Sequence, residues 1–107
     1  MKIPKEFKCA GNVITVKMVD KLKDHEYGNW CDATNTIELA KSIYIDEDNT
    51  VELTEEQITN SFYHELGHCF QFYFDNSCDE ARAQTFANFM CEFIRTSDTI
   101  DDEDEFS

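Results

Sequence analysis

The residues with the clearest chemistry are two histidines four positions apart, His64 and His68, in the segment HELGH. On a helix, side chains four positions apart lie one turn apart on the same face, so both imidazoles can bind one Zn²⁺. Glu65 projects from the adjacent position, where it can reach a water on the metal and act as its general base. Because metal binding lowers the pKa of such a water toward about 7, the pattern predicts hydrolysis at neutral pH.

A catalytic zinc site needs a third protein ligand, and two acids downstream are candidates for it. One class of zinc hydrolases has a third histidine six residues after the second, but Phe74 occupies that position here. The other class uses a glutamate from a following helix. Glu80 is the preferred candidate, because it opens the next expected helix on the stripe that faces inward. Asp79 is the alternative, since its shorter side chain also points inward but could equally cap that helix.

Other interpretations of the same residues stay open at this point. An HExxH string also arises by chance on amphipathic helices, and a zinc site can bind metal without catalysis. Cys78 is a less favoured thiolate ligand near the same helix start. His25 is expected in a solvated loop; if that loop folds over the cleft, His25 or Tyr27 could stabilise an oxyanion.

Two helices must position the HELGH residues and the following acids. Thr54-Glu55-Glu56-Gln57 has the form of a capping box, which predicts a helix start. Its apolar stripe continues at helical spacing through about Phe74 and comprises Ile58, Phe62, Leu66, Cys69 and Tyr73. The second helix is expected to begin within residues 77–80, with an inward stripe of Ala83, Phe86, Ala87, Met90 and Phe93 or Ile94. We also expect four aromatic residues to pack in the core or against the sheet: Phe70, Phe72, Tyr73 and Phe74.

The first half of the chain has the alternation and turn residues of short strands. Residues 5–9 and 13–19 form a predicted hairpin across Ala10-Gly11-Asn12, and residues 30–33 and 36–40 form another. Ile43 to Ile45 is a further expected strand. The predicted fold class is therefore α+β, with a small twisted N-terminal sheet packed against the HExxH helix and a second, C-terminal helix.

The composition describes one small and strongly acidic domain. The chain has 107 residues, 41% of them hydrophobic, and a formal net charge of -14. We expect one domain over residues 1–96 and a disordered acidic tail over residues 97–107. Such a charge repels phosphate backbones and anionic headgroups, so nucleic-acid and membrane partners are not expected. A partner should be neutral or basic.

The cysteines and the N-terminus indicate a cytoplasmic protein. The five cysteines include no CxxC pair, and residues 1–21 lack the continuous apolar stretch of a secretory signal. No apolar run approaches the roughly 20 residues that cross a bilayer. We therefore expect reduced thiols and no disulfide framework.

The segment FYHELGHCFQFYF followed by DEARAQTFANFM resembles small zinc metallopeptidases of the ImmA/IrrE type and their phage-encoded relatives. The resemblance covers about residues 54–94 and rests on HELGH, the acidic start of the second helix and an Ala-x-x-Phe-Ala pattern at residues 83–87. The sequence departs from the family at Arg82, where the commoner form has glutamate. We do not extend repressor cleavage, known for some members, to this chain.

This resemblance implies a gluzincin-like site of HExxH plus glutamate. His64, His68 and Glu80 would bind one Zn²⁺ per chain, and Glu65 would be the catalytic acid/base. It also implies that an edge strand holds an extended peptide by main-chain hydrogen bonds, for which residues 36–40 are our candidate.

The leading expectation is a zinc metalloendopeptidase, a hydrolase acting on a peptide or protein substrate. The alternative is a non-catalytic acidic interaction or inhibitor protein that retains the metallopeptidase fold.

Overall fold

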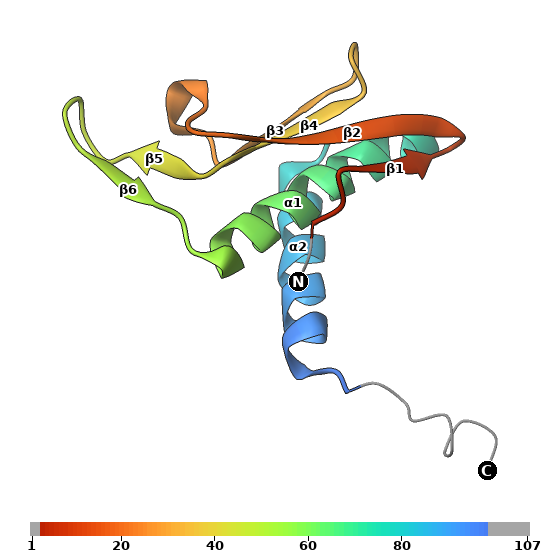
Figure 1. The fold of residues 1–107 in the computed structure, drawn as a ribbon. Helices are drawn as coiled ribbons and strands as arrows, with labels where there is room; N and C mark the ends of the chain where they lie inside the picture. The colour runs from red at the N-terminus through yellow and green to blue at the C-terminus, as the bar shows by residue number, and fades with distance from the viewer. Residues whose placement is uncertain (1–2, 99–107) are drawn as a thin grey trace.

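The structure is a computed structural model that describes residues 3–98. It contains a four-stranded mixed sheet in the order β1-β2-β4-β3, a separate β5-β6 hairpin and two helices, α1 and α2 (Figure 1). The predicted α+β class is confirmed. From residue 99 on, the expected acidic tail lies outside the described residues, and its disorder stays a prediction.

The first hairpin forms as predicted. Strands β1 (Glu6–Cys9) and β2 (Asn12–Val19) pair antiparallel across a two-residue turn. Ala10 and Gly11 in this turn have φ of 51° and 81°, the left-handed values that such a tight hairpin requires. Along β2, Ile14 points into the core and is fully buried.

The second hairpin forms too, but its two strands take different places from those expected. Strands β3 (Gly28–Cys31) and β4 (Thr36–Ala40) pair antiparallel, and β4 also pairs parallel with β2. The prediction that residues 36–40 form a sheet edge is therefore wrong, because β4 lies inside the sheet and the two edge strands are β1 and β3. The reason is burial: Ile37, Leu39 and Ala40 are 0% exposed, which suits an interior strand.

A smaller hairpin links the sheet to the helices. Strand β5 (Ser42–Tyr44) matches the short strand expected near Ile43, and β6 (Thr50–Glu52) pairs with it antiparallel. Strand β6 is not predicted from the sequence, because its three residues are exposed and have no buried face.

Both predicted helices are present. Helix α1 (Glu55–Phe70) starts with the complete capping box, in which Gln57 N donates to Thr54 Oγ1 over 3.1 Å. A π-helical turn (Gln71–Asp75) extends it to Asn76, which has left-handed φ. Helix α2 (Glu80–Thr96) follows after a short connection. Neither helix in the described part of the chain has the length and apolar character that a membrane span requires.

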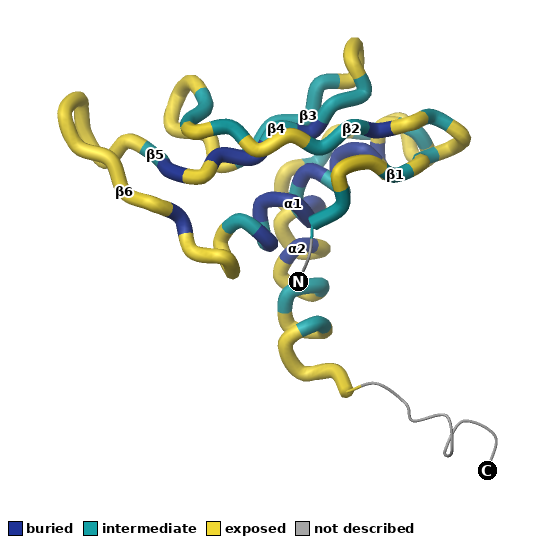
Figure 2. Tube along the Cα trace, in the orientation of Figure 1, coloured by how far each residue is buried: buried dark blue, intermediate teal, exposed yellow. Residues whose placement is uncertain are grey.

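The core lies between α1 and the sheet (Figure 2). Its buried members come from both sides of that contact and from α2: Ile14, Ile37, Leu39, Phe62, Tyr63, Cys69 and Ala87. Cys69 is thus a core residue, as expected, and burial raises the pKa of its thiol to about 12, with the neighbouring Cys9 thiol adding to the effect.

Several aromatic residues expected in the core are exposed instead. Helix α2 runs past the sheet (Figure 1), so only the stripe around Ala83 and Ala87 is fully buried. Phe86, beside that stripe, has 37% of its surface exposed. Of the two alternatives at the end of the stripe, Phe93 is 53% exposed, whereas Ile94 packs against the core cluster. Phe70 and Phe74, at and after the end of α1, are exposed in the same way. Phe72 is 41% exposed but makes an edge contact with Trp30 of β3 at a centroid distance of 6.1 Å, and so packs against the sheet as expected. Of the four aromatic residues in that segment, Tyr73 alone packs against the core cluster.

Candidate metal centre

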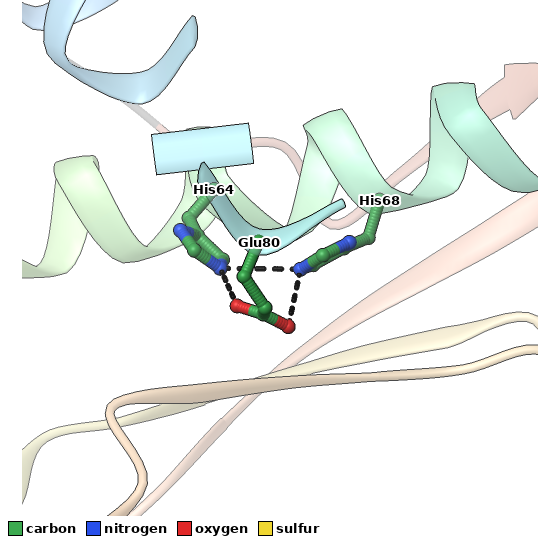
Figure 3. Close-up of side chains that lie close together, drawn as sticks. All are labelled: His64, His68 and Glu80. Carbon is green, nitrogen blue, oxygen red and sulfur yellow. Dashed lines mark hydrogen bonds and ion pairs between the residues drawn. The ribbon is translucent and has the colours of Figure 1, made fainter. Parts of the chain in front are cut away.

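His64, His68 and Glu80 meet at one point between the two helices (Figure 3). The Nε2 atoms of the two histidines are 3.2 Å apart. Each lies 2.9 Å from a different carboxylate oxygen of Glu80, Oε2 for His64 and Oε1 for His68. These three side chains form a group that could hold a metal ion.

The close approach of the helices brings Glu80 to the histidines. Gly67 lies between them on α1 and faces Ala83 on α2, and a Cβ at Gly67 would lie only 3.3 Å from the Ala83 Cα. The start of α2 is also tied to the end of α1. Asp79 N donates to Gln71 Oε1 over 2.9 Å, and Gln71 Nε2 donates to Asp79 O over 3.1 Å.

These bonds determine the tautomer of His68. Because Gln71 Oε1 accepts from the Asp79 amide, the orientation of the Gln71 side chain is fixed, and Oε1 faces His68 Nδ1 at 3.2 Å. Nδ1 must therefore be the donor in this contact. In a neutral imidazole, a proton on Nδ1 leaves Nε2, the atom that faces Glu80, with a free lone pair.

The same reasoning applies to His64. Gln84 Nε2 donates to Asn60 Oδ1 over 2.9 Å and to Asn88 Oδ1 over 2.8 Å. In this orientation of the Gln84 amide, its Oε1 is the acceptor for His64 Nδ1 at 2.9 Å. A neutral His64 with its proton on Nδ1 likewise has its lone pair on Nε2. Amide or carboxylate partners at the second ring nitrogen are typical of metal-binding histidines.

Two lone pairs and a carboxylate at this separation repel one another unless a cation, either a proton or a metal ion, lies among them. Tetrahedral zinc with Zn–N bonds of about 2.05 Å places two ligand nitrogens about 3.3 Å apart. The observed Nε2–Nε2 distance of 3.2 Å is close to this value. Two imidazoles and one carboxylate are also the ligands of catalytic zinc sites that keep a position open. The residues present therefore fit Zn²⁺.

Glu80 and Asp79 have different roles at the helix start. Asp79 is the N-cap of α2, and its Oδ1 accepts from Arg82 N over 3.0 Å, the capping role considered for it above. The Glu80 side chain reaches the histidines, but 76% of its surface is exposed. We expected Glu80 to face inward. Instead it lies at the open side of the helix pair, where an ion would remain accessible.

Glu65 lies beside the group but is buried, with 7% of its surface exposed. It sits under the edge strand β3, where a Cβ at Gly28 would lie 3.1 Å from Glu65 Cγ. Burial raises the pKa of Glu65 from 4.5 to about 7; His64 opposes this rise, and the negative charges of Glu80 and Glu26 add to it. A carboxyl group with a pKa near neutrality can both accept and release a proton, as general acid/base chemistry requires.

These residues line a cleft of about 590 Å³ between the start of β3 and the two helices. Tyr27 and Cys78 line this cleft, but Cys78 is not part of the ligand group. His25 does not line it; its Nδ1 lies 3.1 Å from Tyr44 O, and the residue is exposed, as expected for a loop. Further polar and aromatic lining residues are Asn29, Trp30, Gln57, Asn60, Ser61 and Gln84.

The sequence interpretation missed the two glutamines that orient the histidines. A signal for them exists, because Gln71 follows His68 by three positions and Gln84 follows Glu80 by four. Both spacings bring side chains together on one helix face.

Comparisons of the chain with protein-family models, with curated proteins and with solved structures found no match. The convergence of His64, His68 and Glu80 therefore stands on geometry alone.

Proposed function

We propose that this protein is a zinc-dependent metallopeptidase of the ImmA/IrrE-like type that hydrolyses peptide bonds in a peptide or protein substrate. The observation that carries the proposal is the convergence of the His64, His68 and Glu80 ligand atoms within 4.8 Å, in a cleft that also contains Glu65. An ion held by two imidazoles and one carboxylate keeps an open position for a water and a carbonyl oxygen.

In this proposal, His64, His68 and Glu80 hold Zn²⁺ and Glu65 moves protons. The bound ion supplies a Lewis acid, which lowers the pKa of water and polarises a peptide carbonyl. Glu65 accepts the proton of the attacking water on a carboxylate oxygen and then donates it to the leaving amine. Its pKa of about 7 suits both steps at neutral pH.

The edge strand β3 is the proposed support for the substrate. Gly28, Asn29 and Trp30 of this strand line the cleft beside Glu65. An extended peptide can add to such an edge through main-chain hydrogen bonds, which would place its carbonyl groups along the cleft. In this proposal, β3 holds the substrate, the role expected of residues 36–40 from the sequence.

Metal analysis together with Glu65→Gln tests the proposed chemistry. We expect about one zinc per chain in both proteins, and a kcat/KM for cleavage of an unstructured peptide library that is about 10²- to 10⁴-fold lower in the variant. Cleavage unchanged by the substitution would refute the mechanism. A zinc-loaded protein that cleaves no peptide would point to the interaction or inhibitor protein considered as the alternative.

Two matched variants test the third ligand. Glu80→Ala is expected to abolish zinc retention through dialysis, because it removes the carboxylate. Asp79→Asn keeps the helix cap and should leave zinc retention unchanged. If Asp79→Asn loses zinc and Glu80→Ala keeps it, the assignment of the third ligand is wrong.

A further inference from the structure

The charged residues that line the cleft are, apart from the two histidines, all acidic. Glu26, Glu65 and Glu80 are among the lining residues, whereas no lysine or arginine of the described chain lines it. Glu80 belongs to the ligand group, and Glu65 is the proposed acid/base. Glu26 is the one acidic residue lining the cleft that has no part in that chemistry.

Glu26 occupies a defined place in the cleft. It lies two residues before the edge strand β3, and its backbone N–H donates to Lys23 O over 3.2 Å. Its carboxylate is exposed and has no ion pair with any residue in the described range 3–98. Glu26 lines the same cleft as Glu65 and Glu80. It therefore borders the space that a bound substrate would occupy.

We propose that Glu26 is a specificity residue that selects substrates with a positive charge near the scissile bond. This inference rests on the proposed peptidase function and names its substrate class. The cation is an ammonium or guanidinium group, from a lysine or arginine side chain or from a free N-terminal amine. Such a cation would form an ion pair with the Glu26 carboxylate, and the net charge of -14 attracts such peptides over longer distances.

The first experiment measures cleavage by the zinc-loaded protein. Peptides that differ only in lysine, norleucine or glutamate at each position around the scissile bond are compared, each with a free and with an acetylated N-terminus. We expect kcat/KM to favour lysine at one position about three- to tenfold. Glu26→Gln should remove this preference, and Glu26→Lys should reverse it in favour of glutamate. A preference that acetylation alone abolishes would identify the cation as the terminal amine.

Glu47→Gln is the matched control. Glu47 is exposed in the turn between β5 and β6 and does not line the cleft, yet its substitution removes the same charge from the protein. The lysine preference should persist in this variant. If Glu47→Gln reduces the preference as much as Glu26→Gln does, the selectivity comes from the overall charge and the proposal is overturned.

A binding experiment tests the same residue without catalysis. Zinc-loaded Glu65→Gln protein is titrated with alanine octapeptides that carry one central lysine or norleucine and an uncharged fluorophore. We expect Kd about three- to tenfold lower for lysine, and equal values once Glu26→Gln is added. Equal Kd values for the lysine and norleucine peptides in the protein that retains Glu26 would overturn the proposal. Binding that prefers lysine, without any cleavage, would refute the peptidase function but support the role of Glu26. Cleavage without a lysine preference would support the peptidase function but refute the role of Glu26.

Discussion

Helix α1 has two working faces that are stabilised in different ways. Its sheet-facing side, with Phe62 and Cys69, is held by apolar packing on Ile14 and Leu39. On its cleft-facing side, the His64 and His68 rings are held by hydrogen bonds to side-chain amides. Gln84 of α2 is the partner of His64, and Gln71 of the following turn is the partner of His68. The first face determines whether the domain folds. The second adds little to folding and determines how the lone pairs are presented, so the two faces can be perturbed separately.

Phe62→Ala should have the largest effect on stability, and it tests the packed face. Phe62 is 2% exposed and makes edge contacts with Phe7 and Tyr63 at centroid distances of 6.3 and 5.1 Å. Loss of the ring leaves a cavity, so we expect the free energy of unfolding to fall by about 3–5 kcal/mol in chemical denaturation. The zinc affinity of the molecules that remain folded should be unchanged.

Phe89→Ala is its control on α2. Phe89 is 61% exposed and stacks on Phe93, so its removal should change the free energy of unfolding by less than about 1 kcal/mol. A large loss of stability in this variant would show that the exposed aromatic face of α2 is covered in solution.

Glu65 connects the two faces, because its burial makes stability depend on pH. Its pKa is about 7 in the folded protein, against an ordinary value of 4.5. Between these values the folded state binds the proton more tightly, so stability should fall as pH rises from 4.5 to 7 and level off above. Since a tenfold change in proton affinity is worth about 1.4 kcal/mol, the fall is about 3 kcal/mol.

The measurement is chemical denaturation of the metal-free protein at a series of pH values, compared with Glu65→Gln. The difference between the two proteins isolates Glu65, because the other titrating groups are common to both. We expect the variant to gain stability relative to the parent as pH increases toward 7. A difference that stays constant with pH would mean that Glu65 is not buried as the structure has it.

Gln84→Ala tests the hydrogen-bonded face without disturbing the packed one. Gln84 is exposed, so the free energy of unfolding should change by less than about 1 kcal/mol. His64 Nδ1 loses its acceptor at 2.9 Å, and we expect zinc affinity to fall about tenfold in a competition titration with a chelator. Gln84→Glu keeps an acceptor and should retain the affinity of the parent. Equal affinities in all three proteins would contradict the tautomer assigned to His64.

The two faces also differ in how far sequence could predict them. The helical period of Phe62, Leu66 and Cys69 correctly gave α1 and its packed side, because burial of one face imposes that period. The spacing of His64 and His68 gave their convergence for the same geometric reason. The N-cap motif located the start of α2, and with it Glu80.

What sequence could not supply depends on contacts between distant segments. Strand β4 was mistaken for the edge, because nothing local in residues 36–40 shows that β2 pairs with it in parallel. The spacing predicts that Phe86 faces the core and does not decide between Phe93 and Ile94. The structure leaves Phe86 partly exposed and packs Ile94 on the core, because α2 extends beyond the sheet. The spacing of apolar residues shows which side of a helix is apolar, but it does not show how far the element that packs on this side extends along the helix.

Gly28→Ala should have the smallest effect on stability, and it acts where the sheet edge meets the cleft. The new Cβ would lie 3.1 Å from Glu65 Cγ and 3.3 Å from its Oε2, so the carboxylate must shift by a few tenths of an ångström. The contact costs free energy, while the loss of glycine's freedom in the unfolded chain returns about 0.4–1 kcal/mol, and stability should stay within about 1 kcal/mol of the parent. Under the proposed mechanism, displacement of the Glu65 carboxylate should lower kcat about tenfold and leave the zinc content unchanged.

A double-mutant cycle separates this contact from a general effect on β3. In a Glu65→Ala background the Cγ and carboxylate are absent, so Gly28→Ala should there stabilise the protein by about 0.4–1 kcal/mol in chemical denaturation. If Gly28→Ala has the same effect on stability in both backgrounds, the two residues do not touch. The cleft would then be wider at Glu65 than the structure shows, and a substrate rather than the sheet edge would have to hold the carboxylate in place.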